Sequence, residues 1–259
     1  MINRDFKQRL VTGKPLLGAQ LRFGSPAIAE MFAAAGYDFV VIDTEHAAQS
    51  PPGVVAQMQG AASRGAASLV RLGKNDPDLI RLYLDLGAEG IVVPLIETAE
   101  EARLGANACR YPPQGTRGYG PSRAAAYGFD DGYRLRANDE VVFVPVIETT
   151  EAVENIDEIL AVEGLDSYVV GEWDLSVSLG IPMEFEHPRF KQALAKVEQA
   201  AARCGKPRGW SMDLGDAHGE TFQQLIERGF TFLWVDGDEW MLQSLCQKVT
   251  EEFSKVRER

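Results

Sequence analysis

The chain has few of the residues on which disulfide-rich and thiolate-bound metal proteins depend. Its 259 residues include three cysteines, which are far apart and form no Cys-x-x-Cys pair. Neither a disulfide framework nor a thiolate metal site is therefore indicated, and a reducing cytoplasm is the expected compartment. No uninterrupted apolar run approaches the ~20 residues that a membrane-spanning helix needs.

Positive charge is also scarce, because 26 lysines and arginines stand against 38 aspartates and glutamates, a formal net charge of -12. This balance argues against a nucleic acid or an anionic membrane as the main partner. Residues 1–15 mix charged and apolar positions like a short amphipathic helix rather than a secretory signal. With 45% hydrophobic residues and no linker, we expect one domain over residues 1–259.

Eight short apolar runs of β character alternate with helical segments. The runs cover residues 16–20, 38–43, 68–71, 90–94, 141–148, 167–171, 207–212 and 231–236. Helices are expected at residues 26–35, 51–64, 76–86, 98–109, 150–160, 187–204 and 216–228. Many of these segments begin at Ser-Pro or Asp-Pro pairs or end at glycine, as helices do. Eight such repeats predict a (β/α)8 TIM barrel with a parallel sheet.

Several of these runs end in charged residues. Glu148 ends the fifth run and Asp174 follows the sixth, while Arg71 ends the third and Glu45 and His46 follow the second. An acid at the end of a buried strand needs a positive partner, and a divalent cation with oxygen ligands is one such partner. Taken singly, each residue has a strand cap or an ion pair as its alternative explanation.

The connection over residues 110–138, between the fourth and fifth runs, is the longest and is rich in glycine, arginine and tyrosine. A loop of this length inside a compact domain is usually functional or disordered. We expect an active-site or subunit-interface loop that leaves from the carboxyl ends of the strands. A surface excursion is the alternative.

Ordered motifs along nearly the whole chain carry a family resemblance. They include Gly24-Ser-Pro-Ala-Ile-Ala-Glu, Asp43-Thr-Glu45-His46-Ala, Val70-Arg71, Leu84-Asp85-Leu-Gly-Ala, Val93-Pro94-Leu-Ile-Glu-Thr, Arg110-Tyr-Pro-Pro-Gln-Gly-Thr-Arg-Gly, Ile147-Glu148-Thr and Val170-Gly171-Glu-Trp-Asp174-Leu-Ser. In these motifs the chain resembles the HpcH/HpaI family of class II, metal-dependent pyruvate aldolases. The resemblance implies a TIM barrel and a homo-oligomer, a trimer or hexamer, in which a helix after Asp236 is exchanged between subunits.

The resemblance also implies the roles of the central residues. Glu148 and Asp174 are expected to bind Mg²⁺, Mn²⁺ or Co²⁺, whose other positions are filled by water and a 2-oxo acid. Arg71 would bind the substrate and stabilise an enolate oxygen. His46 and Asp85 would form a dyad that transfers protons.

Residues around this centre are expected to complete the site. Gly171, Glu172, Trp173 and Gln20 would contact the substrate. Asp43 and Glu45 would brace Arg71 or His46. The chain departs from the family pattern where Glu172 replaces proline, Val146 replaces glutamine and Gln20 replaces an aromatic residue, so the usual substrate preference is not implied.

Charge at the mouth of the barrel bears on the second substrate. Acidic residues expected there are Glu172, Asp213, Asp236 and Asp238. They would disfavour a polyanionic acceptor unless Arg22, Arg117 or Arg123 offsets them. Arg22 and Arg123 are the candidates for binding an acceptor carboxylate.

The expected reaction is the reversible cleavage of a 4-hydroxy-2-oxo acid to pyruvate, or a related 2-oxo acid, and an aldehyde. A metal-stabilised enolate would be the intermediate, and no Schiff-base lysine is expected. One alternative is an oxaloacetate decarboxylase or an acyl-thioester condensing enzyme on the same barrel. Another is a non-catalytic metal-binding barrel.

Overall fold

Eight parallel strands form a closed barrel in the structure, a computed structural model that describes residues 5–212 and 221–257. The strands are β1 (Leu16–Leu21), β2 (Phe39–Asp43), β3 (Ala67–Arg71), β4 (Gly90–Val93), β5 (Val142–Ile147), β6 (Val169–Val170), β7 (Arg208–Met212) and β8 (Phe230–Gly237). Their order is β6-β5-β4-β3-β2-β1-β8-β7, and a parallel bridge between Tyr168 and Arg208 joins the two ends. The predicted barrel is confirmed.

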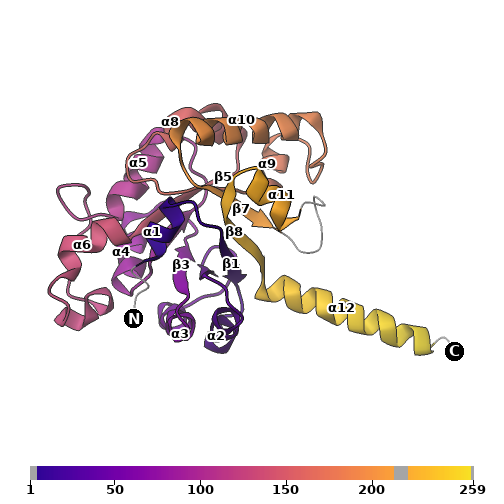
Figure 1. The fold of residues 1–259 in the computed structure, drawn as a ribbon, viewed down its shortest axis with the longest axis horizontal. Helices are drawn as coiled ribbons and strands as arrows, with labels where there is room; N and C mark the ends of the chain where they lie inside the picture. The colour runs from indigo at the N-terminus through magenta and orange to yellow at the C-terminus, as the bar shows by residue number, and fades with distance from the viewer. Residues whose placement is uncertain (1–4, 213–220, 258–259) are drawn as a thin grey trace.

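Helices follow the strands and surround the barrel (Figure 1). They are α1 (Phe6–Val11), α2 (Pro26–Ala34), α3 (Pro51–Ala62), α4 (Pro77–Asp85), α5 (Ala99–Ala108), the 3-10 helix η1 (Arg123–Gly128), α6 (Tyr133–Glu140), α7 (Thr150–Glu154), α8 (Ile156–Leu160), α9 (Glu172–Ser178), α10 (Pro188–Cys204), α11 (Phe222–Glu227) and α12 (Asp238–Arg257). None of the helices in the described ranges is long and apolar enough to span a bilayer.

Most expected helices are present, with three differences. The segment expected at residues 150–160 is divided at Asn155 into α7 and α8. The segment expected at 216–228 begins outside the described residues, and its described part is α11. Helices η1, α6 and α9 were not predicted, because with six, eight and seven residues they are too short to show a clear helical period of apolar residues.

Alternate residues of each strand face two different apolar layers. On β2, Phe39 and Val41 pack inside the barrel, whereas Val40 and Ile42 pack outward among the helices. The inward series continues to Asp43 at the carboxyl end of the strand. The same alternation carries Gln20, Arg71 and Glu148 to the inside of that end.

Helix α1 closes the opposite, amino end of the barrel. Its buried Phe6 and Leu10 belong to the inner apolar layer. The ring of Phe6 lies 5.6 Å from that of Phe39, which stacks at 4.6 Å on Phe232. A side chain at Gly18 would lie 2.2 Å from the Phe39 ring, so this position needs glycine. With α1 filling the amino end, the described residues leave the carboxyl end of the barrel for an internal site.

The long connection lies at the amino edge, which corrects the sequence-based expectation. It starts after α5 and leads into β5, and a helix-to-strand connection in a parallel barrel lies at the amino ends of the strands. Helix α5, which lies between β4 and this segment, returns the chain to the amino edge. The segment has a small apolar cluster of its own, including Tyr111, Tyr133 and Ala137.

Helix α12 contacts the barrel at its start and then projects away from it (Figure 1). It exposes a series of apolar side chains, with exposed fractions between 52% and 67%. They are Leu242, Leu245, Val249, Phe253 and Val256. Such an apolar series on an isolated helix is typical of a contact surface.

Candidate active site

A cavity of about 480 Å³ opens at the carboxyl ends of the strands. Its lining combines carboxylates, basic groups and indole rings: Gln20, Arg22, His46, Arg71, Val146, Glu148, Val169, Val170, Gly171, Glu172, Trp173, Asp174, Ser211, Trp234 and Trp240. Most of the residues expected from the sequence line this cavity. Asp43 and Glu45 support it from behind, and Asp85 is not part of the lining.

Glu148 is a buried carboxylate that lines the cavity together with the carboxylate of Asp174. It follows β5, is 7% exposed and accepts a hydrogen bond at 2.7 Å from the backbone N–H of Leu95. Leu95 has a φ of +53°, which a residue with a side chain rarely adopts. Burial raises the pKa of Glu148 to about 7, and the charges of Asp174 and Glu45 act in the same direction. A cation bound beside Glu148 would oppose this rise and favour the ionised carboxylate.

Gly171 lets the turn after β6 approach Glu148. A Cβ atom at this position would lie 2.7 Å from Oε2 and 2.8 Å from Cβ of Glu148. Helix α9 begins at the next residue and brings Glu172, Trp173 and Asp174 to the cavity. Glu172 is 8% exposed, so the acid that replaces proline is buried rather than directed to solvent.

Asp43 organises the basic side of the cavity. Its fully buried carboxylate accepts hydrogen bonds from Arg71 at 3.1 and 2.5 Å, and from Gln20 at 2.7 Å and Arg22 at 3.1 Å. Backbone N–H groups of Glu45 and His46 also donate to it. Burial alone would raise the pKa of Asp43, but the Arg71 hydrogen bonds and charge outweigh it and lower the pKa to about 2.

Glu45 and His46 follow β2 at the rim. Glu45 lies 3.3 Å from Nε of Arg71 and 3.5 Å from Nε2 of His46. Burial raises the pKa of Glu45, while the neighbouring Arg71 and His46 oppose that rise. The His46 side chain is 54% exposed and can therefore exchange protons with a bound molecule or with water.

Asp85 does not meet His46 within one chain. It ends α4, at the amino edge of the barrel, and pairs there with Arg117 at 2.6 Å. Arg117 is buried, and its guanidinium lies 4.6 Å over the ring of Tyr111. The expected dyad is therefore not formed inside a subunit, because the helix returns Asp85 to the end opposite His46.

The other residues expected at the mouth have mixed outcomes. Arg123 lies at the amino edge and donates to the carbonyl of Leu86 at 2.8 Å, so it is absent from the cavity. Asp238 is buried and accepts hydrogen bonds from backbone N–H groups, so its carboxylate adds no free charge to the mouth of the barrel. Asp213 and the side chain of Asp236 lie outside the described residues.

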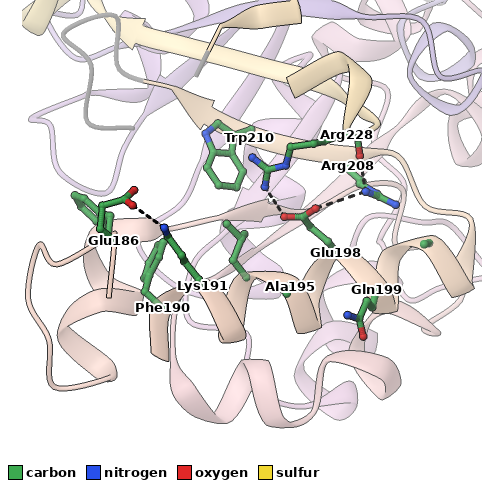
Figure 2. Close-up of a pocket in the computed structure, with 12 residues that line it drawn as sticks. Glu186, Phe190, Lys191, Ala195, Glu198, Gln199, Arg208, Trp210 and Arg228 are labelled. Carbon is green, nitrogen blue, oxygen red and sulfur yellow. Dashed lines mark hydrogen bonds and ion pairs between the residues drawn. The ribbon is translucent and has the colours of Figure 1, made fainter. Parts of the chain in front are cut away.

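A second cavity, of about 540 Å³, lies outside the barrel along α10 (Figure 2). Its charged groups are already matched, because Glu198 pairs with Arg228 at 2.5 Å and Arg208 at 3.8 Å, and Lys191 pairs with Glu186 at 2.6 Å. The other lining residues are apolar except for Gln199, and they include Phe190 and Trp210. Because the acids and bases of this groove already pair with one another, the cavity inside the barrel is the better candidate for an active site.

Comparison with known proteins agrees with the barrel and its carboxyl-end cavity. Residues 21–232 match the model of the HpcH/HpaI aldolase/citrate lyase family. The chain belongs to this family. The resemblance inferred from the motifs is thus confirmed.

Relatives in this aldolase family cover almost the whole chain. The hydroxypyruvate/pyruvate aldolase of Deinococcus radiodurans is 36% identical over 99% of this chain and 92% of its own length. The 4-hydroxy-2-oxo-heptane-1,7-dioate aldolase of Klebsiella pneumoniae is 35% identical over 98% and 95%. A solved HpcH/HpaI aldolase/citrate lyase family protein from Burkholderia cenocepacia has a TM-score of 0.89 at 32% identity, covering 97% and 99%. Aldolases are carbon–carbon lyases.

The donor set of this family member fits a hard divalent cation. Within the described residues no three His, Cys, Asp or Glu side chains converge as a complete ligand set. Glu148 and Asp174 provide two carboxylates at one cavity wall, and the remaining ligands would be oxygens from outside the protein. Burial, helped by the charges of Asp174 and Glu45, raises the pKa of Glu148, and a cation bound at this wall would favour its ionised form.

Sequence reasoning missed parts of the cavity wall. Trp234 faces inward on β8 and could have been found from the alternation of that strand. Trp240 and Leu95 carried no such signal. Trp240 reaches the cavity from α12, and Leu95 contributes only its backbone N–H, which donates a hydrogen bond to Glu148.

Proposed function

We propose that the protein is a divalent-metal-dependent aldolase that reversibly cleaves a 4-hydroxy-2-oxo acid to pyruvate, or a related 2-oxo acid, and an aldehyde. The observation that carries this proposal is the meeting of Glu148 and Asp174 with Arg71 and His46 in one cavity. Carboxylates for a cation, a fixed guanidinium and an accessible imidazole are the groups that enolate chemistry needs.

Glu148 and Asp174 would hold Mg²⁺, Mn²⁺ or Co²⁺. When bound, the cation supplies Lewis-acid stabilisation of negative charge on the substrate's oxo oxygen. Gly171 permits the approach of α9 that places Asp174 beside Glu148. Trp173 and Glu172, which flank this ligand, would contact the substrate, as would Gln20.

Arg71 would donate to the oxygen on which charge develops. Asp43 and Glu45 hold its guanidinium in place from behind, so the group needs little rearrangement as the reaction proceeds. In the cleavage direction the C4 hydroxyl loses its proton, the C3–C4 bond breaks, and its electron pair forms the enolate of pyruvate. Protonation at C3 then gives the methyl group.

His46 would transfer these protons, since an imidazole near neutral pH can both accept and donate. Asp85 can join it only from a second copy of the chain, because within one subunit the two lie at opposite ends of the barrel. The exposed apolar series on α12 supports a homo-oligomer, in which this helix would pack on a neighbouring subunit. Static light scattering of the intact protein tests the assembly.

Exchange of solvent deuterium into the methyl group of pyruvate, followed by NMR, tests the chemistry without any aldehyde. Protein treated with EDTA should show no exchange, and Mg²⁺, Mn²⁺ or Co²⁺ should restore it. His46→Ala should slow exchange by ~10²–10⁴-fold. His187→Ala, a histidine at the start of α10, serves as the matched control. Exchange that persists in Glu148→Ala and Asp174→Ala would contradict the proposal.

A further inference from the structure

We infer that Trp240 and Trp173 form the acceptor subsite, and that the aldehyde it takes has a flat, uncharged, apolar body such as an aromatic ring. This inference rests on the proposed aldolase function and specifies its second substrate. It is carried by three features of the cavity: the fixed first turn of α12, the arrangement of its indoles and the pairing of its arginines.

The first turn of α12 is fixed to the end of β1. Asp238 is 6% exposed and accepts hydrogen bonds from the backbone N–H groups of Arg22 at 2.9 Å and Phe23 at 3.0 Å. These bonds bring the start of the helix against the barrel, although its later turns project away (Figure 1). Trp240, in this same turn, is thereby placed in the cavity wall.

The indole of Trp240 is held in a defined orientation. The guanidinium carbon of Arg22 lies 4.3 Å from its ring centre, an arrangement that favours cation–π attraction. The ring of Trp173 lies 6.1 Å from that of Trp240, at an interplanar angle of 66°. Trp173 is 50% exposed, so it presents apolar surface at the mouth. Two angled indoles make a surface on which a planar apolar group can pack.

Trp240 lies across the cavity from the strand that supplies the proposed cation ligand Glu148, whereas Trp173 reaches it from α9, next to Asp174. Trp234 and Trp240 belong to β8 and the helix after it, and β8 is the neighbour of β1. Glu148 follows β5, whose neighbours are β4 and β6. A 2-oxo acid bound beside Arg71 and Glu148 would thus leave the wall formed by Trp240 for the aldehyde.

Charge in the cavity disfavours an anionic acceptor. Arg22 is paired with Asp43 at 3.1 Å and with Glu239 at 3.2 Å. Arg71 is paired with Asp43 and Glu45. Among the described residues that line the cavity, both arginines are therefore already matched by carboxylates. These pairings favour a role for Arg22 in supporting Trp240 over the binding of an acceptor carboxylate.

Three aldehydes separate stacking from charge in the aldol addition to pyruvate. Benzaldehyde has the ring alone, 4-formylbenzoate adds a carboxylate, and acetaldehyde has no ring. With the metal-loaded enzyme, kcat/KM for benzaldehyde should exceed that for each of the other two by ~10-fold. Trp240→Ala should lower the benzaldehyde value by ~10-fold and change the acetaldehyde value by less than about 2-fold, while Trp240→Phe should retain most of it.

Deuterium exchange into pyruvate, measured on the same variants, keeps the two proposals distinguishable. Normal exchange in Trp240→Ala, together with the lost preference for benzaldehyde, supports the subsite. Normal exchange with an unchanged preference overturns the subsite but leaves the aldolase. Absence of exchange in the unmodified protein overturns the aldolase itself. Gln243→Ala, at an exposed polar position of the same helix, is the matched control, and an equal loss there would assign the effect to the helix as a whole and overturn the subsite.

Discussion

The carboxylate of Asp43 accepts two hydrogen bonds from the guanidinium of Arg71, at 3.1 and 2.5 Å, across adjacent strand ends. The two residues are direct partners in the register of β2 and β3. Because each faces the inside of the barrel, the sheet itself sets their geometry. The permanently charged arginine is thus presented to the cavity by backbone pairing rather than by a loop.

Asp43→Asn should therefore impair both stability and chemistry. Removing one partner of a buried ion pair costs about 3–5 kcal/mol of the free energy of unfolding. The disordered guanidinium should also lower the pyruvate exchange rate by ~10²-fold. Urea denaturation and NMR exchange measure the two effects. Asp38→Asn removes an aspartate that pairs with Arg9, so it should reduce stability while leaving the exchange rate of the folded protein unchanged.

Gly171→Ala should weaken metal binding. The added Cβ would lie 2.7 Å from Oε2 of Glu148, so either the ligand or the turn must move. We expect the Mn²⁺ dissociation constant, measured by calorimetry, to rise by ~10–100-fold. Gly120→Ala is the control, since nothing lies within 4 Å of that position. If the two variants bound Mn²⁺ with equal affinity, the turn after β6 would have made room for the added Cβ without moving Glu148.

The metal-free protein should lose stability as pH rises from about 4.5 to about 7. The pKa of Glu148 is raised from 4.5 to about 7 in the folded state, mainly by burial. In this window the unfolded chain has released the Glu148 proton while the folded chain retains it, so rising pH favours unfolding. Asp43 acts elsewhere, because its lowered pKa contributes stability that is lost only as pH falls from 3.8 towards about 2.

Urea midpoints at pH 5 and pH 7 in EDTA measure this effect. The midpoint should be lower at pH 7 in the unmodified protein, and the difference should shrink in Glu148→Gln, whose side chain does not titrate. Added Mn²⁺ should raise the midpoint at pH 7 in the unmodified protein alone. A difference of equal size in Glu148→Gln would assign the pH dependence to other groups.

Mixing two inactive variants tests whether Asp85 serves a second subunit. His46→Ala and Asp85→Ala should each reduce pyruvate exchange, and mixed oligomers should regain part of it, since some sites then contain both native residues. Arg81→Ala, also on α4 but exposed, is the control that should retain activity. If mixing restores nothing, Asp85 acts through its pair with Arg117 at the amino edge instead.

Much of the candidate site follows from the alternation of strand residues. Gln20, Asp43, Arg71 and Glu148 occupy inward positions at the carboxyl ends of strands, so a parallel barrel must bring them together. The charged ends of separate apolar runs were therefore a usable signal. The family motifs extended this signal to Asp174 and Gly171, whose positions depend on the turn before α9.

Other contacts depend on how helices and loops return to the barrel. The sequence pattern does not contain the direction in which each helix or loop runs after it leaves the barrel. These directions decide whether Asp85 meets His46, whether residues 110–138 face the site and whether Trp240 enters it. A helix that follows a strand carries its end to the opposite edge of the barrel, as α4 does with Asp85. The backbone bonds to Asp238 likewise turn α12 towards the cavity.

The sequence by itself determined the eightfold repeat, the family and the charged strand ends, because periodicity and short motifs are local properties of a chain. Only the tertiary structure decided that Asp43 holds three side chains at once, that Arg117 rather than His46 pairs with Asp85, and that indoles from α9 and α12 meet. These outcomes depend on distances between residues far apart in sequence, which are set by closure of the barrel and packing around it.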